Sequence, residues 1–249
     1  MTFSIGNLIH WFTNGQHWSG PDGIPVRIGQ HLFISAVAVA AAILVALPIG
    51  LAIGHRRRGE FLAVSVANIG RAVPSFAVLV LVFAFMARLA PSIAFGFGPG
   101  VITLLLLGIP PILTNTIVGV QNVDADTVEA ARGMGMRERD ILLRLELPLA
   151  SGLILGGIRT AVLQIVATAT LIALIGGGGL GRYIIDGNAQ GDTTMTVAGA
   201  VLVALLAIVT ELAMGYTQRL LTPRTSSTAQ KRARHQPREF GPQPRLGDI

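Results

Sequence analysis

The chain is organised around residues 123–148, VDADTVEAARGMGMRERDILLRLELP, a charged stretch that lies between long apolar runs. Apolar residues recur in this stretch at roughly helical spacing, and Gly133 and Gly135 interrupt the pattern as a helix C-cap and turn would. Asp126, followed three residues later by Glu129, matches a variant of the capping box. The pattern predicts two short helices joined by a Gly-Met-Gly turn, the second of them ended by Pro148.

Composition places the rest of the chain in a membrane. Of its 249 residues, 51% are hydrophobic and only 13% are charged, whereas charged residues make up about 25% of an average soluble domain. Cysteine is absent, which excludes disulfides and thiolate metal sites. The net charge of +6 comes almost wholly from arginine. In a membrane protein such an excess usually sets orientation.

Hydropathy predicts an all-α, polytopic membrane protein with five transmembrane helices, or six if one broken run crosses twice. That run is interrupted by Arg71 and Pro74, and we interpret it as a single crossing with a break. The predicted division is an outer N-terminal segment (1–31), a transmembrane domain (32–221) and a disordered basic tail (222–249). Within the domain, the predicted spans are 32–54, 61–88, 100–121, 152–175 and 193–217, and the predicted loop is 122–150. In the first span, Gly50 and Gly54 are spaced for close helix packing.

Charge predicts the orientation. If the N-terminus lies outside the cell, fourteen basic residues fall in cytoplasmic segments and three in outer segments, and the reverse topology would invert this ratio. His55-Arg-Arg-Arg58 is the strongest single signal. The predicted location is therefore the cell membrane, with the C-terminus and loop 122–150 in the cytoplasm.

Polar and helix-breaking residues inside the predicted spans are candidates for a translocation path. An intramembrane arginine is costly, so Arg71 lines a path or else extends to the cytoplasmic face; the sequence favours neither. Adjacent prolines leave backbone carbonyls unpaired, which a membrane tolerates only beside protein or water. The candidates are Arg71, Pro74, Ser75, Pro110, Pro111, Asn115 and Thr168.

Several other kinds of site are disfavoured by the sequence. The histidines before residue 32 lack metal-ligand spacing, and interfacial aromatics with incidental histidines explain that segment better. Gly176 to Gly181 lacks the Gly-Lys-Ser/Thr ending of a phosphate loop. Lys231 to Arg234 has no interleaved aromatics, so contact with anionic lipid is favoured there over nucleic acid. No catalytic cluster or cofactor motif is evident, and we expect neither an enzyme nor a bound cofactor.

One motif in loop 122–150 is similar to a known family. Glu129-Ala-Ala131, three residues, Gly135, nine residues and Leu145-Glu-Leu-Pro148 resemble the EAA loop of binding-protein-dependent ABC-transporter permeases, with Leu145 where the family usually has Ile. The resemblance implies the type I ABC importer fold. It also implies that the loop docks into a partner ATPase through Glu129, Ala130, Ala131, Gly133, Gly135, Leu147 and Pro148. The alternative is an ordinary amphipathic hairpin between two membrane helices.

Segments 68–79, 109–124 and 175–184 resemble osmoprotectant permeases of that family. The resemblance implies ATP-driven uptake of glycine betaine, carnitine, choline or proline betaine. ATP would be used by a cytoplasmic ATPase dimer, and the other partners would be a second permease copy or homologue and an external binding protein. One alternative is a permease for methionine or another amino acid. A less favoured alternative is a proton-coupled carrier, for which Glu211 is the sole candidate carboxylate.

Overall fold

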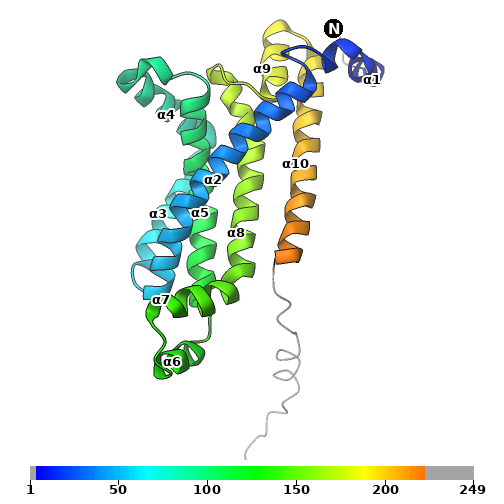
Figure 1. Ribbon diagram of the computed structural model, residues 1–249. Helices are drawn as coiled ribbons and strands as arrows, with labels where there is room; N and C mark the ends of the chain where they lie inside the picture. The colour runs from blue at the N-terminus through cyan, green and yellow to red at the C-terminus, as the bar shows by residue number, and fades with distance from the viewer. Residues whose placement is uncertain (1–3, 222–249) are drawn as a thin grey trace, which may run out of the picture.

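The computed structural model describes residues 4–221, and every regular element in that part of the chain is helical (Figure 1). This confirms the predicted all-α fold. The N-terminal helices are α1 (Ile5–Thr13), η1 (Gly15–Trp18), α2 (Ile24–Arg56), α3 (Glu60–Ala72), α4 (Ser75–Leu89) and η2 (Pro91–Ile93). They are followed by α5 (Phe97–Gln121), α6 (Ala125–Gly133), α7 (Glu138–Ile141), the π-helix η3 (Leu142–Glu146), α8 (Leu147–Thr168), η4 (Ala169–Ile175), α9 (Gly181–Gln190) and α10 (Thr193–Leu221). The predicted tail 222–249 lies outside the described residues.

Between residues 4 and 221, four helical runs are long and apolar enough to cross a membrane: α2, α5, α10 and the continuous run Glu138–Ile175. Helices α3 and α4 pass the same test only as a pair, and they are bent by 94° at Val73 and Pro74. The pair is a broken span or a re-entrant segment, which brings the number of candidate spans to five. Helix α2 begins at Ile24, where the sequence predicts a start at residue 32, because Gly23 and Pro25 form an ordinary helix beginning.

Helices α2, α5 and α8 form the centre of the bundle, and small residues let them approach closely. A Cβ atom added at Gly50 would lie 2.8 Å from Cβ of Thr116, and one added at Gly54 would lie 2.8 Å from Cβ of Val120. The predicted close packing at this glycine pair is therefore confirmed, and its partner is α5. Ala42, Ala46, Ile112 and Ala161 continue the contact as a buried cluster.

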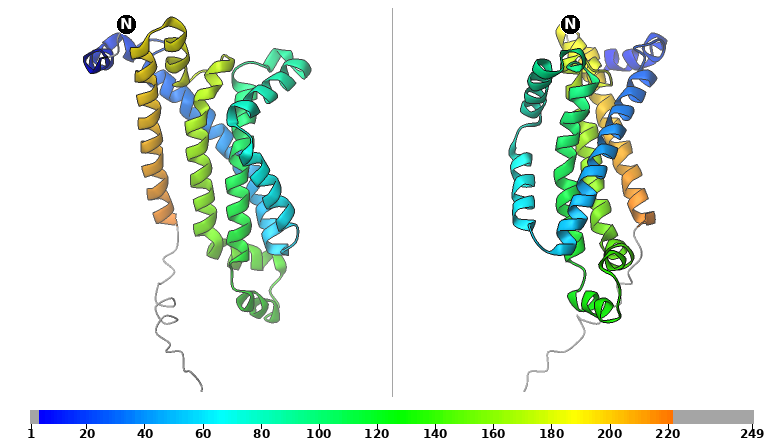
Figure 2. Two further views of the ribbon diagram at one scale, coloured as in Figure 1. Left: turned by 180° about the vertical axis from the view of Figure 1, so that it is seen from behind. Right: turned by 60° about the vertical axis from the view of Figure 1, so that its left-hand side comes forward.

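The two ends of the bundle are formed by different helices. At one end, α1 and α9 cover the start of α10, with Trp11 and Tyr183 in a shared apolar cluster. At the opposite end lies the hairpin of α6 and α7, and α10 runs from the first end toward the second (Figures 1 and 2). The segment before residue 32 is therefore largely helical, since it contains α1, η1 and the first two turns of α2.

Candidate functional site: the charged hairpin and its junction with the bundle

The hairpin at residues 123–148 contains the two predicted helices, but the first begins differently. Asp124 is the N-cap of α6: its carboxylate accepts a hydrogen bond from the backbone N–H of Asp126 at 3.3 Å. The same carboxylate accepts a hydrogen bond from the Thr127 hydroxyl at 3.1 Å. The predicted Asp126 cap is wrong by two residues. Asp126 lies in the first turn instead, where its negative charge interacts favourably with the positive end of the helix dipole.

The turn between α6 and α7 depends on Gly135. This residue has φ +82°, in the left-handed region that glycine adopts most easily. The backbone N–H of Met136 then donates to the carbonyl of Ala131 at 3.1 Å, which closes the end of α6. The structure thus confirms the turn predicted from the two glycines.

The hairpin has a small apolar core of its own. Val123, Val128, Ala131 and Ile141 are buried together, with Met136 and Leu145 packed against them. The side chain of Ala131 is therefore an internal contact between the two helices and not part of the exposed surface. Of the other predicted coupling residues, Glu129, Ala130, Gly133, Gly135 and Pro148 are exposed and Leu147 is half-buried.

Pro148 does not end the second helix, which corrects the sequence prediction. The helix continues from Glu138 to Ile175, and Pro148 lies in the first turn of α8. The π-helix Leu142–Glu146 immediately precedes it, and there the N–H of Leu147 donates to the carbonyl of Leu142. This wider turn accommodates a proline that can donate no hydrogen bond of its own. Helix α7, the π-helix η3 and α8 consequently form one continuous helical run, which bends where it enters the bundle (Figure 1).

A buried carboxylate joins the hairpin to α2. Glu146 is 2% exposed, and its Oε2 lies 2.6 Å from Nδ1 of His55. The other ring nitrogen of His55, Nε2, lies 3.0 Å from Oε2 of Glu138. Arg132 completes the network, donating from Nε to Glu138 Oε1 at 2.8 Å and from Nη2 to Oε2 at 3.1 Å. These hydrogen bonds from Arg132 are the main reason that the pKa of Glu138 lies below its ordinary value of 4.5.

Arg57 provides a second link between α2 and the hairpin. This residue ends α2 with φ +50°, and its Nη2 donates to the carbonyl of Val123 at 3.2 Å. From the sequence, His55 to Arg58 have a predicted orienting role only, and nothing in their pattern indicates this junction. One signal was present: Glu146 lies four residues after Leu142 and four before Ala150, on an otherwise apolar helix face. A charge at such a position needs a partner.

The predicted translocation residues are dispersed. Arg71 and Pro74 are exposed at the bend between α3 and α4, and Ser75 follows them half-buried. Pro110 and Pro111 are buried inside α5, where Asn115 donates from Nδ2 to the carbonyl of Pro111 at 2.8 Å. Pro111 also packs against α8, because a Cβ atom at Gly157 would lie 2.7 Å from its carbonyl oxygen. Thr168 is half-buried at the far end of α8. Both prolines are thus buried within this chain, Pro111 in a contact with α8, and their place in a translocation path stays a prediction.

Glu211 pairs with Arg159 across α8 and α10. Nε of Arg159 donates to Oε2 of Glu211 at 3.2 Å, and its Nη2 also donates to Oε1 of Glu211. Gln218 extends the contact, accepting from Nη1 of Arg159 at 3.2 Å and donating to the carbonyl of Gly152 at 3.3 Å. The single carboxylate considered for proton coupling is thus held in an ion pair.

Three comparisons place the chain among known proteins. It is 35% identical over 198 residues to a glycine betaine/carnitine/choline transport system permease protein of Bacillus subtilis (strain 168), covering 80% of this chain and 88% of the relative. It is 35% identical over 194 residues to a choline transport system permease protein of the same organism, covering 78% and 86%. Its fold matches a structure of the MetNI methionine ABC transporter with a TM-score of 0.69 at 21% identity, covering 80% of this chain and 96% of that one.

The likeness to the solved structure concerns the fold, which is that of type I ABC importer permeases, as the sequence predicted. Residues 28–227 match the family model described as the binding-protein-dependent transport system inner membrane component. This match includes the candidate spans from α2 onward and the whole hairpin. The chain belongs to the family of binding-protein-dependent transport system inner membrane components.

Proposed function

We propose that this ABC importer permease carries an osmoprotectant such as glycine betaine, carnitine, choline or proline betaine across the cell membrane. Support for the substrate class comes from relatives that are 35% identical over most of both chains and whose names include glycine betaine, carnitine and choline. The methionine transporter shares the fold at 21% identity. So low an identity says nothing about the substrate of this chain. An amino-acid substrate is therefore the weaker alternative.

The observation that carries the coupling proposal is the double attachment of the hairpin. It is continuous with α8 through η3, and the His55–Glu146 contact at 2.6 Å attaches it to α2. A force applied to the exposed side of the hairpin would therefore reach two central helices together. Because a small apolar core makes the hairpin a compact unit, it would move as a lever and shift the bundle between two packed states.

In this proposal the force comes from a cytoplasmic ATPase dimer. Each ATPase would contact the exposed side of α6 and the turn at Glu129, Ala130, Gly133 and Gly135, with the hairpin in the cytoplasm and the N-terminus outside. ATP would be hydrolysed by the partner, and an external binding protein would deliver the substrate to a pair of permeases. A proton-coupled carrier is less well supported, since Glu211 is already paired with Arg159.

The test is uptake into proteoliposomes that contain the permease, its co-expressed ATPase and its binding protein. With ATP on the side of the ATPase, we expect accumulation of radiolabelled glycine betaine or choline above that of methionine. Uptake that follows a proton gradient without ATP would contradict the importer. ATP-driven uptake of methionine alone would contradict only the proposed substrate class.

A further inference from the structure

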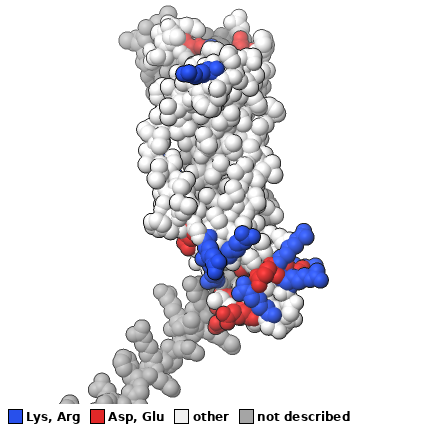
Figure 3. All heavy atoms as spheres, turned by 90° about the vertical axis from the view of Figure 1, so that its left-hand side faces the viewer, with Lys and Arg blue, Asp and Glu red and all other residues white. Residues whose placement is uncertain are grey.

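A cavity lies where the end of α2 meets the hairpin, and most of its lining is basic. It has a volume of about 610 Å³ and is lined by Arg56, Arg58, Arg132, Arg139, His55, Glu138 and Leu142. Figure 3 shows basic side chains gathered over the hairpin end of the molecule, with acidic ones among them, below a body that is almost uncharged on this face. Four arginines and one carboxylate give the cavity a marked excess of positive charge.

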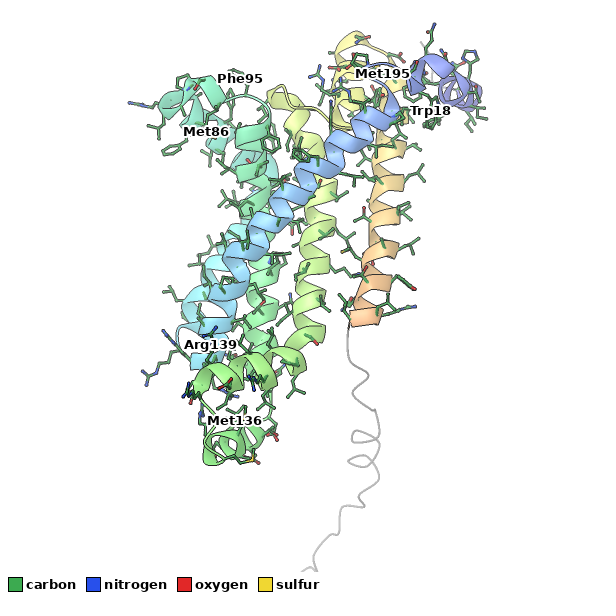
Figure 4. The ribbon with its side chains drawn as sticks, in the orientation of Figure 1. Trp18, Met86, Phe95, Met136, Arg139 and Met195 are labelled. Atoms are coloured by element: carbon green, nitrogen blue, oxygen red, sulfur yellow. The ribbon has the colours of Figure 1, made fainter. Side chains whose placement is uncertain are left out.

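The carboxylate does not neutralise the cavity. Glu138 is already engaged by Arg132 and His55. Arg56, Arg58 and Arg139, in contrast, make no ion pair or side-chain hydrogen bond to any residue between 4 and 221. In Figure 4, Arg139 extends outward from the hairpin. Three guanidinium groups are thus available to donate hydrogen bonds to an anion, and a guanidinium suits phosphate oxygens because of its planar fork.

The surface beside this cavity is apolar. Helix α3 begins two residues after Arg58, and its first turns expose Phe61 at 86%, Leu62 at 69%, Val66 at 60% and Ile69 at 67%. So many exposed large apolar side chains on a short helix fit contact with hydrocarbon. The arginines therefore lie where an apolar surface gives way to a charged one, which is the depth of lipid phosphates in a bilayer.

We propose that this basic cavity binds the headgroup of an anionic phospholipid, with the acyl chains lying along the exposed face of α3. Charge selects an anion, the guanidinium groups select a phosphodiester, and the adjoining apolar helix selects a lipid over a soluble phosphate. The proposal relies on the proposed orientation only for assigning the lipid to the cytoplasmic leaflet. Binding itself is independent of transport and of the substrate.

The test is native mass spectrometry of the purified full chain, titrated with phosphatidylglycerol or with phosphatidylcholine of the same acyl chains. We expect phosphatidylglycerol to bind more tightly, and each arginine neutralised in the cavity to weaken its binding about fivefold. The double variant Arg56→Gln/Arg58→Gln should show this loss. The matched control is Arg137→Gln/Arg144→Gln, which removes two charges from the same end of the molecule but not from the lining of the cavity. It should retain its preference for phosphatidylglycerol.

Two further variants guard against an insertion defect. Arg139→Gln leaves His55 to Arg58, which set the orientation, unchanged and should still weaken lipid binding. Arg58→Lys keeps the positive charge and should retain most of the lipid binding. Equal losses in the cavity and control variants would overturn the proposal. Displacement of phosphatidylglycerol by inorganic phosphate at equal concentration would overturn it in favour of a soluble anion. Unchanged lipid binding with lost ATPase co-purification would overturn it in favour of a protein contact.

Discussion

The His55 ring, at the end of α2, lies 2.6 Å from the buried carboxylate of Glu146, which is 91 residues later in the chain. The side chains of His55 and Glu146 are 13% and 3% exposed. This contact attaches a central membrane helix to the hairpin, and the second ring nitrogen of His55 reaches Glu138 from the other side.

Removing one partner of this contact should destabilise the junction. We expect His55→Ala to lower the free energy of unfolding by about 3 kcal/mol, because it leaves the carboxylate of Glu146 buried without a partner. The double variant His55→Leu/Glu146→Leu should regain much of this loss, since it removes the charge as well. Thermal unfolding of the purified permease measures both. If the double variant loses as much stability as the sum of the losses in His55→Leu and Glu146→Leu alone, the two residues are not coupled.

The same substitution should have different effects at Ala130 and at Ala131. Ala130 is exposed on α6, whereas Ala131 is 3% exposed inside the hairpin. Ala130→Arg should leave membrane abundance unchanged but abolish ATPase co-purification and ATP-driven uptake, because it obstructs the proposed docking surface. Ala131→Arg should reduce abundance or disorder the hairpin, because it buries a charge. If Ala130→Arg keeps normal uptake, this side of α6 is not the docking surface.

Two glycines in the hairpin allow a test of the backbone alone. Gly133 and Gly135 both have open space where a Cβ atom would lie, but only Gly135 has a positive φ. Gly135→Ala should cost about 1–2 kcal/mol, because an L-residue is strained in the left-handed region. Gly133→Ala should be neutral or slightly stabilising. Thermal unfolding separates the two, and equal costs would show that the turn does not depend on φ at Gly135.

Acid should loosen the hairpin at Glu138. The folded-state pKa of this carboxyl is lowered from 4.5, chiefly by hydrogen bonds from Arg132 and further by the charges of Arg132 and His55. Its contribution to stability is therefore present above pH 4.5 and is lost as the pH falls through the lower folded value. A spin label on a cysteine at Met134 should gain mobility over that range. In the Glu138→Gln background the label should show little further change on acidification.

Single cysteines can test the proposed orientation, because the chain has none of its own. Ser92, Asn188 and Met134 are all exposed. In intact cells, an impermeant maleimide should label cysteines at Ser92 and Asn188, and it should label one at Met134 only after the cells are opened. The reverse pattern would place the hairpin outside the cell and refute its docking to an ATPase.

Much of this protein follows from local sequence patterns. Apolar runs of about 20 residues must form helices in a membrane, since only helices satisfy every backbone hydrogen bond within one such segment. Gly133 and Gly135 mark the turn of the hairpin, and Gly50 and Gly54 mark a close helix contact. The orientation stays a prediction from charge. These features depend on neighbours in the chain, so periodicity and composition suffice to identify them.

Tertiary structure decided the features that depend on distant residues. Whether Ala131 faces a partner or the hairpin core depends on where Ile141 packs, and spacing alone cannot distinguish the two. Pro148 would end an isolated helix, but here a π-helical turn widens the backbone before it and the helix continues. Glu146 is buried because His55 meets it from another helix. Such pairings depend on the distance between side chains in the folded bundle, which the order of residues does not reveal.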